Sequence, residues 1–417
     1  MFNRLKGTKD IYGLELKVVN YIKEMFFNVS KKYNCEEIQT PIIEDINLFI
    51  RSVGETSDIV SKEMYAFEDL GGRKIALRPE GTASAIRAFC ENRINNMEWG
   101  RFSYFGPMFR YERPQKGRYR QFLQGGIELI ENKSSYTNLE IIKLAVDFLE
   151  AIKVKDYILQ INNLGSFETR NKYISELKKY FENYKDQLNE ISKIRLEKNV
   201  LRILDDKEEI QKEFVKNAPK LLDFLSSEEK QDFQDLLNLL EKFNINYQIN
   251  PYLVRGLDYY NDIVFEFVSN SEALGSQSTI LAGGRYDGMI KEFGGPDIGS
   301  IGFAFGVDRL SEIITFNIDN YEELLEDNSI LIGWQNEEDK DFILKVAYEI
   351  RKEFNVKLIN KQISIKNLFK NQFKFKPKYL IFKELNTKEK ELKVKTSEKE
   401  FIFEYNDIED FKKAIKE

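Results

Sequence analysis

The segment from Gly106 to Glu128 constrains the fold of this chain more than any other part of the sequence. Two strand-like stretches flank a Pro-Gln-Lys-Gly turn, which is the pattern of a β-hairpin. The turn and its flanks carry five positive charges, at Arg110, Arg113, Lys116, Arg118 and Arg120. These charges repel one another strongly unless an anion joins them. The segment therefore predicts a hairpin that binds an anion, and a triphosphate is the obvious candidate.

The second strand of this hairpin is expected to present an ordered binding face. If 121–128 is a strand, period two places alternate residues on one side, namely Phe122, Gln124, Gly126 and Glu128. That side offers an aromatic plate, an amide, a gap and a carboxylate, which suit a flat base and an amine-bearing or cationic ligand. Because Gly126 has no side chain, we expect it to let the ligand approach closely. The alternative is a charge-rich surface hairpin, which would not require such order.

The complete absence of histidine restricts the chemistry. It excludes zinc protease motifs, Ser-His-Asp triads and Cys-His dyads. Catalysis must then depend on carboxylates, arginine, lysine and bound ions. The only cysteines, Cys35 and Cys90, stand far apart, so we expect neither a thiolate zinc site nor a disulfide framework, and assign no metal ligand among the side chains.

Length and charge favour a soluble multidomain protein. The 417 residues suggest two or three domains. The chain has 63 Lys and Arg against 69 Asp and Glu, and its net charge of −6 excludes a globally basic nucleic-acid coat protein. A polyanion would therefore have to bind to a local basic patch. The first residues lack the apolar core of a signal peptide, and no stretch approaches the roughly 20 apolar residues that span a bilayer. We expect a cytoplasmic protein without a membrane partner.

Hydrophobic spacing predicts a first fold that is interrupted and then resumed. Its early part contains a helix over 17–32, a short strand over 37–43, a hairpin over 64–82 and a helix over 83–91. Between Leu139 and Ile245 the sequence becomes charged and leucine-rich, with a break at 162–165, which indicates a helical insertion, expected at about 166–246. Ser226 and Glu229 form a candidate capping box there.

Glycine-rich and β-rich sequence returns after this insertion. The stretch from 283 to 306 indicates that the first fold resumes there, and the acidic, polar residues 313–328 predict a linker. A first domain is therefore expected over 1–325.

A small α/β domain is expected over 329–417. A strand over 330–334, a helix over 340–353 and a strand over 379–382 follow one another. Eight lysines stand without an acidic residue among them: Lys357, Lys361, Lys366, Lys370, Lys374, Lys376, Lys378 and Lys383. They form either a solvated face or a surface for a phosphate backbone, and the phenylalanines between them, Phe369, Phe373 and Phe375, are expected in the core.

Three glycine-containing segments are informative only together. Arg255-Gly256-Leu257-Asp258-Tyr259-Tyr260 and Gly283-Gly284-Arg285-Tyr286-Asp287-Gly288 each place arginine and tyrosine beside a glycine turn. The third segment, 299–310, ends in Asp308-Arg309-Leu310 and fits neither a GxGxxG fingerprint nor a P-loop.

In this order the segments resemble the class II aminoacyl-tRNA synthetases, specifically the histidyl-tRNA synthetase family, along essentially the whole chain. Pro41 is similar to the motif 1 proline, 109–128 to motif 2, and 302–309 to motif 3. The segments 255–260 and 283–288 are similar to the two histidine-specific signatures of that family.

The resemblance implies an α/β architecture of the α+β kind. The catalytic domain, 1–325, would hold an antiparallel six-stranded sheet with flanking helices and an insertion at about 166–246. Residues 329–417 would form an α/β anticodon-binding domain, and two chains would form a homodimer across motif 1. The implied reaction is the ligation of L-histidine to tRNA(His) through histidyl adenylate, with ATP and Mg²⁺.

The resemblance also implies roles for single residues. The ATP site would contain Arg110, Glu112, Arg118, Phe122 and Arg309. Arg110 would hold the α-phosphate and Arg118 the outer phosphates, while Phe122 and Arg309 would sandwich adenine. The histidine site would contain Glu80, Thr82, Gln124, Glu128, Arg255, Tyr260 and Tyr286. The first three would fix the α-amino group, and Glu128 and Tyr260 would bind the imidazole beside Tyr286. Arg110 and Arg255 would be catalytic, because Arg255 would stabilise charge at the α-phosphate.

Three positions depart from the family pattern. Leu123 stands where histidine is typical, Gly125 where a bulkier residue is usual, and Asp308 where glutamate is usual. Leu123 and Gly125 fall on the face turned away from the ligand, so we expect reduced packing rather than lost chemistry. The shorter Asp308 would weaken an interaction that orients Arg309.

Two alternative functions belong to other classes. The first is a synthetase-like regulatory subunit of ATP phosphoribosyltransferase, which typically lacks the anticodon domain and has an eroded motif 2. The second is a non-catalytic tRNA-binding paralogue, against which the presence of Arg110, Arg255 and Arg309 counts. The absence of histidine is compatible with natural origin and with redesign.

Overall fold

The computed structural model describes residues 2–54, 57–92, 100–114, 117–204, 206, 208–275, 278–325, 329–375, 377–384 and 387–416. The chain forms two compact units, Met1–Asn317 and Ile318–Glu417. Lys116 and Lys376, two of the charges considered above, lie outside the described residues, as do 326–328 of the predicted linker. No helix in the described ranges combines the length and the apolar character needed to cross a membrane.

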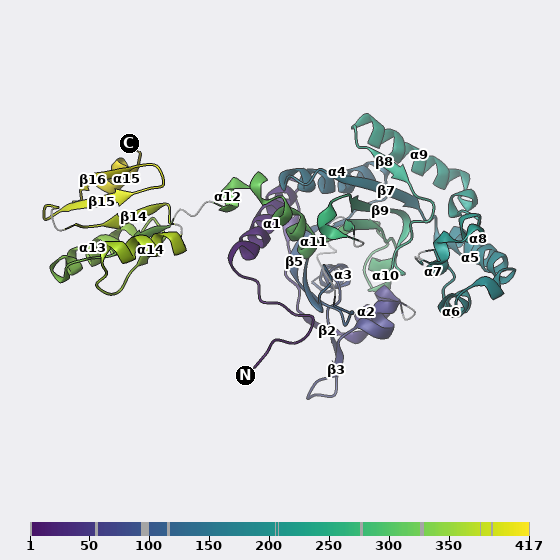
Figure 1. Ribbon diagram of the computed structural model, residues 1–417. Helices are drawn as coiled ribbons and strands as arrows, with labels where there is room; N and C mark the ends of the chain where they lie inside the picture. Colours follow the sequence, from purple (N-terminus) through teal and green to yellow (C-terminus); the bar gives the residue numbers. More distant parts are fainter. Residues whose placement is uncertain are drawn as a thin grey trace. The chain divides into compact units, whose positions relative to one another are not determined.

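A mixed sheet forms the centre of the first unit (Figure 1). Its described strands follow the order β1 (Glu36–Glu37), β5 (Gly100–Phe109), β6 (Gln121–Ile130), β11 (Ser300–Gly306), β10 (Thr279–Arg285), β9 (Asn261–Ser269), β7 (Tyr157–Asn163) and β8 (Tyr247–Ile249). The inner strands from β5 to β7 pair antiparallel, whereas the edge strands β1 and β8 pair parallel. The predicted antiparallel sheet of six strands is confirmed, with a short parallel strand added at each edge.

Three helices cover one face of this sheet: α1 (Gly13–Lys32), α4 (Ser135–Ala151) and α11 (Val307–Phe316). An aromatic cluster joins α1 and α4 to β11, because the Phe305 ring centroid lies 4.9 Å from that of Phe26 and 4.5 Å from that of Phe148. A Cβ at Gly125 would overlap the Phe305 ring. The expected loss of packing at Gly125 is therefore wrong, since Phe305 fills the space that a larger residue would take.

The opposite face carries α3 (Thr82–Glu91) and a small sheet of β2 (Ile43–Asp45), β4 (Lys74–Leu77) and β3 (Ala66–Glu68), with α2 (Ile46–Val53) between β2 and β3 in the chain. The predicted hairpin over 64–82 is confirmed by the antiparallel pairing of β3 with β4. The single strand predicted over 37–43 is wrong: its two ends join different sheets. Pro41 lies between them and has no N–H to donate to a ladder.

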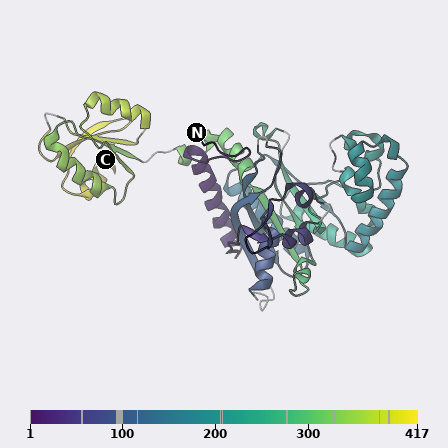
Figure 2. The same cartoon turned by 90° about the horizontal axis from the view of Figure 1, so that it is seen from below.

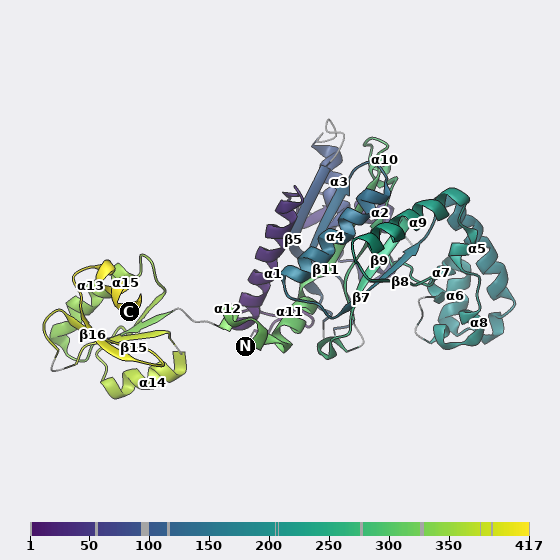
Figure 3. The ribbon, with the colours of Figure 1, turned by 90° about the horizontal axis from the view of Figure 1, so that it is seen from above.

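Residues 166–246 contain the helices α5 (Phe167–Glu182), α6 (Glu190–Lys198), α7 (Leu201–Leu204), α8 (Glu213–Lys216) and α9 (Ser227–Lys242). We call these residues the insertion. Figure 3 labels α5 to α8 as a group beside the central sheet, and the same helices form the teal group of Figure 2. Helix α9 leads back toward the sheet and lies along α4.

One carboxylate, that of Glu229, holds two helix starts of the insertion together. It accepts the backbone N–H of Ser226 at 2.8 Å, while the Ser226 side chain accepts the N–H of Glu229, which confirms the predicted capping box on α9. Glu229 also accepts the N–H of Ser166 at 2.6 Å and the Thr169 hydroxyl at 2.9 Å. Burial raises its pKa, but these hydrogen bonds prevail and lower the pKa to about 2.

The second unit is an α/β domain, as predicted. Its sheet has the order β13 (Val356–Leu358), β12 (Ile330–Ile332), β14 (Tyr379–Phe382), β15 (Glu391–Lys395) and β16 (Glu400–Glu404). The helices α13 (Lys340–Ile350), α14 (Ile365–Phe375) and α15 (Ile408–Lys416) complete it. The buried side chains of Ile332, Trp334, Ile343 and Ile381 belong to its main core.

The predicted linker over 313–328 is wrong in its first part. Helix α11 continues to Phe316, and Ile313 and Ile314 are buried in it. Short helical turns follow at Ile318–Asn320 and at α12 (Glu322–Leu325). Other short turns are Ile59–Glu63, Lys185–Gln187, Glu209–Gln211, Leu221–Phe224, Glu272–Leu274, α10 (Met289–Glu292) and Glu337–Asp339.

The double role of Glu229 predicts a large effect of its removal. In Glu229→Ala, one substitution removes the side-chain acceptor of both the Ser166 and the Ser226 N–H groups. We expect the free energy of unfolding at pH 7 to fall by about 1–3 kcal/mol, measured by urea unfolding. Glu228→Ala, a change at the exposed neighbour in the same helical turn, is the matched control and should cost less than about 0.5 kcal/mol. Equal losses in the two variants would contradict this role.

Candidate active site

A cavity of about 200 Å³ lies over the sheet face that carries α3. All the predicted site residues except Glu128 and Tyr286 line it: Glu80, Thr82, Arg110, Glu112, Arg118, Phe122, Gln124, Arg255, Tyr260 and Arg309. They come from loops and strands that are far apart in the sequence. The fold therefore brings the two predicted ligand sites into one cavity.

Glu128 and Tyr286 are fully buried beside the cavity rather than on its surface, with exposed fractions of 0% and 1%. The Tyr286 hydroxyl donates a hydrogen bond to Oε2 of Glu128. The Tyr286 ring centroid lies 6.4 Å from that of Tyr260, which lines the cavity. A Cβ at Gly302 of β11 would overlap Oε2 of Glu128, and one at Gly284 of β10 would lie 2.9 Å from the Tyr260 ring. Both glycines make room for pocket side chains.

Gly126 accommodates a tyrosine and not a ligand. It stands directly opposite Tyr104 of β5, and a Cβ at Gly126 would overlap the Tyr104 hydroxyl. The expectation that its missing side chain lets the ligand approach is therefore wrong. A Cβ at Gly81 would meet the same ring, so Tyr104 joins β5, β6 and the start of α3. An aromatic residue in the strand-like stretch before the hairpin turn was the sequence signal for this role.

Burial raises the pKa of Glu128 to about 8, and the hydrogen bond from Tyr286 limits this rise. The charge of Glu80 raises the pKa further, whereas the nearby hydroxyls of Thr82 and Tyr104 lower it. Oε1 of Glu128 nevertheless makes no hydrogen bond of normal geometry within the described residues. A buried carboxylate with one unsatisfied oxygen favours a ligand that donates an N–H or O–H group.

Glu80 and Gln124 organise the start of α3 at the cavity wall. The Glu80 carboxylate accepts the backbone N–H groups of Thr82 at 2.7 Å and Ala83 at 2.9 Å, and Oε1 of Gln124 accepts that of Gly81 at 3.1 Å. Burial raises the pKa of Glu80 despite these bonds. Because each carboxylate oxygen can accept more than one hydrogen bond, Glu80 can still accept hydrogen bonds from an ammonium group.

Three arginines from the predicted anion site share the other part of the cavity. Nε of Arg110 donates to the Pro79 carbonyl at 2.9 Å, and Nε of Arg118 lies 3.0 Å from Oε2 of Glu112. Burial lowers the pKa of Arg309, and the charges of Arg118 and Arg110 lower it further, although Glu112 opposes them. An anion bound among these arginines would offset their repulsion.

The aromatic ring predicted for this site is that of Phe122 on β6. The Arg110 guanidinium carbon lies 5.3 Å from the centre of the Phe122 ring, within the range of a cation–π contact. A flat base and a phosphate chain therefore have their expected contacts next to each other on the cavity wall.

Glu266 of β9, which no sequence pattern singled out, links the two sides of the cavity. Glu266 pairs with Arg255 and accepts the Thr279 hydroxyl at 3.0 Å, while Arg309 donates to the Thr279 carbonyl. Burial lowers the pKa of Arg255, but Glu266 and Tyr260 raise it and the net shift is upward, so the guanidinium stays charged. A carboxylate within the apolar stretch Val264–Val268 was the signal for this residue.

Asp308 connects the start of α11 to two other segments. Its carboxylate lies 2.7 Å from Nζ of Lys9 and accepts the backbone N–H of Leu123 at 3.3 Å. The expected interaction of Asp308 was one that orients Arg309, whereas these contacts are made to Lys9 and Leu123. Leu123 and Asp308, two of the departures from the family pattern, are therefore neighbours. No group of three or more Cys, Asp or Glu side chains in the described ranges is arranged to hold a metal ion.

The raised pKa of Glu128 predicts a dependence of stability on pH. The pKa is about 8 in the folded chain against 4.5 for a free side chain, so the folded state binds one more proton between these values. Stability from this group is complete below pH 4.5 and is lost as the pH rises through 8. Between about pH 5 and 7.5, we expect the unfolding free energy of the unchanged protein to fall by about 1.4 kcal/mol per pH unit relative to Glu128→Gln. Urea unfolding across this range measures the difference, and parallel curves would contradict the assignment.

Comparisons with known proteins agree with this geometry. The family model described as histidyl-tRNA synthetase matches residues 7–310. A protein of Mycoplasmopsis pulmonis named histidine–tRNA ligase is 46% identical over 420 residues, covering 100% of this chain and 99% of the relative. One of Mycoplasma mobile with the same name is 48% identical over 352 residues, covering 84% of this chain and 78% of the relative.

Among solved structures, the crystal structure of apo histidyl-tRNA synthetase from S. aureus matches with a TM-score of 0.78 and 29% sequence identity, covering 97% of each chain. The relatives cover nearly the whole chain, and the family model spans the segments on which the resemblance was based. Together with the cavity and its paired acid and arginine sites, these matches establish that the chain belongs to the histidyl-tRNA synthetase family of class II aminoacyl-tRNA synthetases.

Proposed function

We propose that this chain ligates L-histidine to tRNA(His) in two steps, the first being the formation of histidyl adenylate from histidine and ATP. One observation carries the proposal. Three arginines, Arg110, Arg118 and Arg309, line the cavity together with Phe122, and the buried carboxyl group of Glu128, with one unsatisfied oxygen, lies beside it. The names of the relatives support the same reaction.

The first step needs charge stabilisation and positioning rather than a protein base. The histidine carboxylate is ionised at neutral pH and attacks the α-phosphate of ATP, and pyrophosphate leaves with the bond electrons. Arg110 and Arg255 are the proposed catalytic residues, because they would stabilise the charge that develops on the phosphoryl oxygens. Glu266 keeps Arg255 charged and oriented. A chain without histidine loses nothing in such a mechanism.

The ATP site is proposed to contain Arg110, Glu112, Arg118, Phe122 and Arg309. The Phe122 ring would stack on adenine, while Arg118 would meet the outer phosphates. Mg²⁺ bound mainly through the phosphates would supply further positive charge, and Glu112 is the carboxylate that lines this part of the cavity.

The histidine site would select its substrate by polar complementarity. Glu80, Thr82 and Gln124 would hold the α-amino group, and Oε1 of Glu128 would accept an imidazole N–H next to Tyr260. An apolar amino acid would leave the Glu128 carboxylate buried and without that partner. Polar sites of this kind discriminate by roughly 10⁴ to 10⁵.

The two alternatives are less well supported. Both a regulatory subunit of ATP phosphoribosyltransferase and a non-catalytic tRNA-binding paralogue would have no need for Arg110, Arg255 and Arg309 in one cavity. The segment 109–128, which is similar to motif 2, is also retained, and the relatives described above carry the name of the ligase.

The proposed function also assigns roles to the two units and to a partner chain. Residues 1–325 would be the catalytic domain with its insertion at about 166–246, and 329–417 the anticodon-binding domain. Two chains would form a homodimer through the region around Pro41, and the enzyme would work in the cytoplasm, where protein synthesis supplies its tRNA.

Lysines of the second unit are the proposed contacts with the tRNA backbone. Lys366, Lys370 and Lys374 follow one another at intervals of one helical turn on α14, and all three are exposed. Lys383 is excluded from this surface, because it is only 6% exposed and pairs with Asp339 at 2.9 Å. Phe369 packs against Phe382 at 5.5 Å and so belongs to the core, as expected, while the side chain of Phe373 is outside the described residues.

Pyrophosphate exchange tests the first step. With ATP and Mg²⁺, we expect exchange that depends on histidine and on no other amino acid. Arg255→Ala should lower the exchange rate by about 10²- to 10³-fold, because a charge that stabilises the transition state is lost. Arg73→Ala, a change at an exposed arginine paired with Asp69, should leave the rate unchanged. No exchange in the folded protein would reject the enzyme assignment.

Salt dependence tests the tRNA surface. In Lys366→Gln/Lys370→Gln/Lys374→Gln, we expect KM for tRNA in the charging reaction to rise about tenfold near physiological salt, with a weaker dependence of KM on salt. Histidine-dependent pyrophosphate exchange should not change. Lys352→Gln/Lys388→Gln, which alters exposed lysines outside α14, is the control. An unchanged KM in the triple variant would move the tRNA contact elsewhere.

A further inference from the structure

Residues 250–260 connect β8 to β9 and carry Arg255 and Tyr260 into the active-site cavity. We call them the signature loop. They contain no helix or strand, and the hydrogen bonds from the N–H groups of Tyr252 and Leu253 to Asn250, at 3.1 and 3.0 Å, lie in the first part of the loop. A cavity of about 330 Å³ lined by Asp258 lies on the side of the insertion, and a void of about 10 Å³ lies behind Arg255 and Leu257. Leu257 and Asp258 therefore border open space on this side, although apolar side chains of the loop pack into a buried core.

Arg170 on α5 of the insertion contacts the second half of the signature loop. Its guanidinium donates hydrogen bonds to the carbonyl oxygens of Tyr260 at 3.0 Å and Asp258 at 3.2 Å. Arg170 directly follows Thr169, whose hydroxyl is held by Glu229. The start of α5 is thus fixed to α9, and Arg170 extends from a rigid point to the backbone that carries Tyr260.

Arg202 on α7 contacts the first half of the same loop. Its guanidinium donates to the carbonyl oxygen of Gly256 at 2.8 Å, next to Arg255 in the chain. The void behind the loop is lined by Arg170, Arg202 and Arg255 together. Two arginines of the insertion therefore hold the backbone on either side of Leu257.

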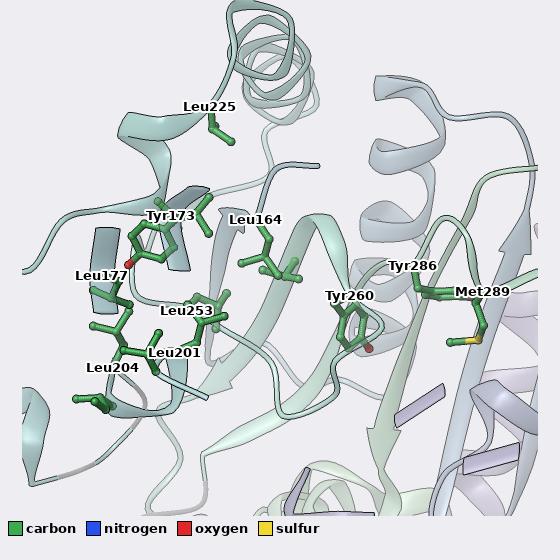
Figure 4. Packing of buried hydrophobic residues seen from close by; sticks show 14 of the residues in the cluster. Leu164, Tyr173, Leu177, Leu201, Leu204, Leu225, Leu253, Tyr260, Tyr286 and Met289 are labelled. Carbon is green, nitrogen blue, oxygen red and sulfur yellow. The ribbon is translucent and has the colours of Figure 1, made fainter. Parts of the chain in front are cut away.

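Apolar contacts also connect the insertion to the active site. One cluster of buried side chains includes Tyr173, Leu177 and Leu201 of the insertion and also Tyr260 and Tyr286 of the active site. Leu164 and Leu253, also labelled in Figure 4, belong to the same cluster. The insertion and the histidine pocket thus share one core, so displacement of one affects the other.

We propose that Arg170 and Arg202 are positioning residues for the reaction, through which the insertion sets the place of Tyr260 and Arg255 in the cavity. The inference rests on the proposed function, since it concerns the histidine and α-phosphate contacts of that reaction. Each arginine acts on backbone carbonyls, so its effect reaches the substrate only through the signature loop.

The two arginines have separable kinetic effects. Arg170 holds the carbonyl of Tyr260, which is proposed to bind the imidazole, so its loss weakens histidine binding. Arg202 holds the residue next to Arg255, which is proposed to stabilise the transition state, so its loss slows chemistry. A misplacement on the order of 1 Å at a reacting group costs up to about 10² in rate.

The test is steady-state pyrophosphate exchange with the full chain. For Arg170→Met, we expect KM for histidine to rise at least tenfold, with kcat within threefold of the unchanged enzyme. For Arg202→Met, we expect kcat to fall at least tenfold with a smaller change in KM for histidine. KM for ATP should stay within twofold in both. Arg170→Lys should recover most of the loss, because its ammonium group can donate to the same carbonyls.

Lys212→Met is the matched control. Lys212 is also a cation of the insertion and donates to a backbone carbonyl, that of Gln187 at 2.7 Å, but this carbonyl lies outside the signature loop. It should lower stability without changing KM or kcat. The same kinetic profile in Lys212→Met and Arg170→Met, or constants within twofold of the unchanged enzyme in both arginine variants, would overturn the proposal.

A second measurement separates this proposal from the proposed function. Hydrogen exchange of the backbone amides in 255–260 should become faster in Arg170→Met and Arg202→Met, while that of 190–198 should not change. If the unchanged protein shows no histidine-dependent exchange of pyrophosphate, the proposed function fails, and the amide exchange still decides on the two arginines. Unchanged amide exchange in both variants would overturn their positioning role.

Discussion

The burial of the Glu128 carboxylate in the middle of an antiparallel sheet imposes conditions on its whole surroundings. A buried acid needs space and hydrogen-bond donors, or it stays protonated. Space comes from Gly302 on the neighbouring strand, and one donor comes from Tyr286. Tyr104 fills the gap at Gly126 and closes the pocket from the other side. The order of strands, β5 next to β6 and β6 next to β11, is what brings these residues to the same place.

The cavity is polarised between its two parts. Beside one part lies Glu128, whose Oε1 lacks a hydrogen-bond donor, and the other part contains Arg110, Arg118 and Arg309, whose charges repel one another. A bound amino acid would supply the missing hydrogen-bond donor, and a bound nucleotide would supply negative charge among the arginines. Glu266 and Thr279 connect the parts by hydrogen bonds, so the arrangement is set before a ligand arrives. Preorganisation of this kind is the source of most electrostatic catalysis.

Period two along β6 was enough to predict that Phe122 and Gln124 lie on one side of the strand, where both line the cavity, because alternation is a property of one strand. It was not enough to predict what fills the gaps. Tyr104 occupies the space at Gly126, and Phe305 the space at Gly125, and both belong to other strands. Contacts between strands depend on register, which the residues of a single segment do not contain. The same reason explains why Glu266 was missed although motif residues around it were found.

The three glycines under the pocket, Gly126, Gly284 and Gly302, lie on three adjacent strands. Glycine is a poor strand former, and a β-branched residue would ordinarily strengthen a sheet at such positions. Here any side chain would displace Tyr104, Tyr260 or Glu128. Replacement of strand glycines is a usual way to raise the thermal stability of a protein. It would fail at these three positions, because the added side chain would disrupt the pocket.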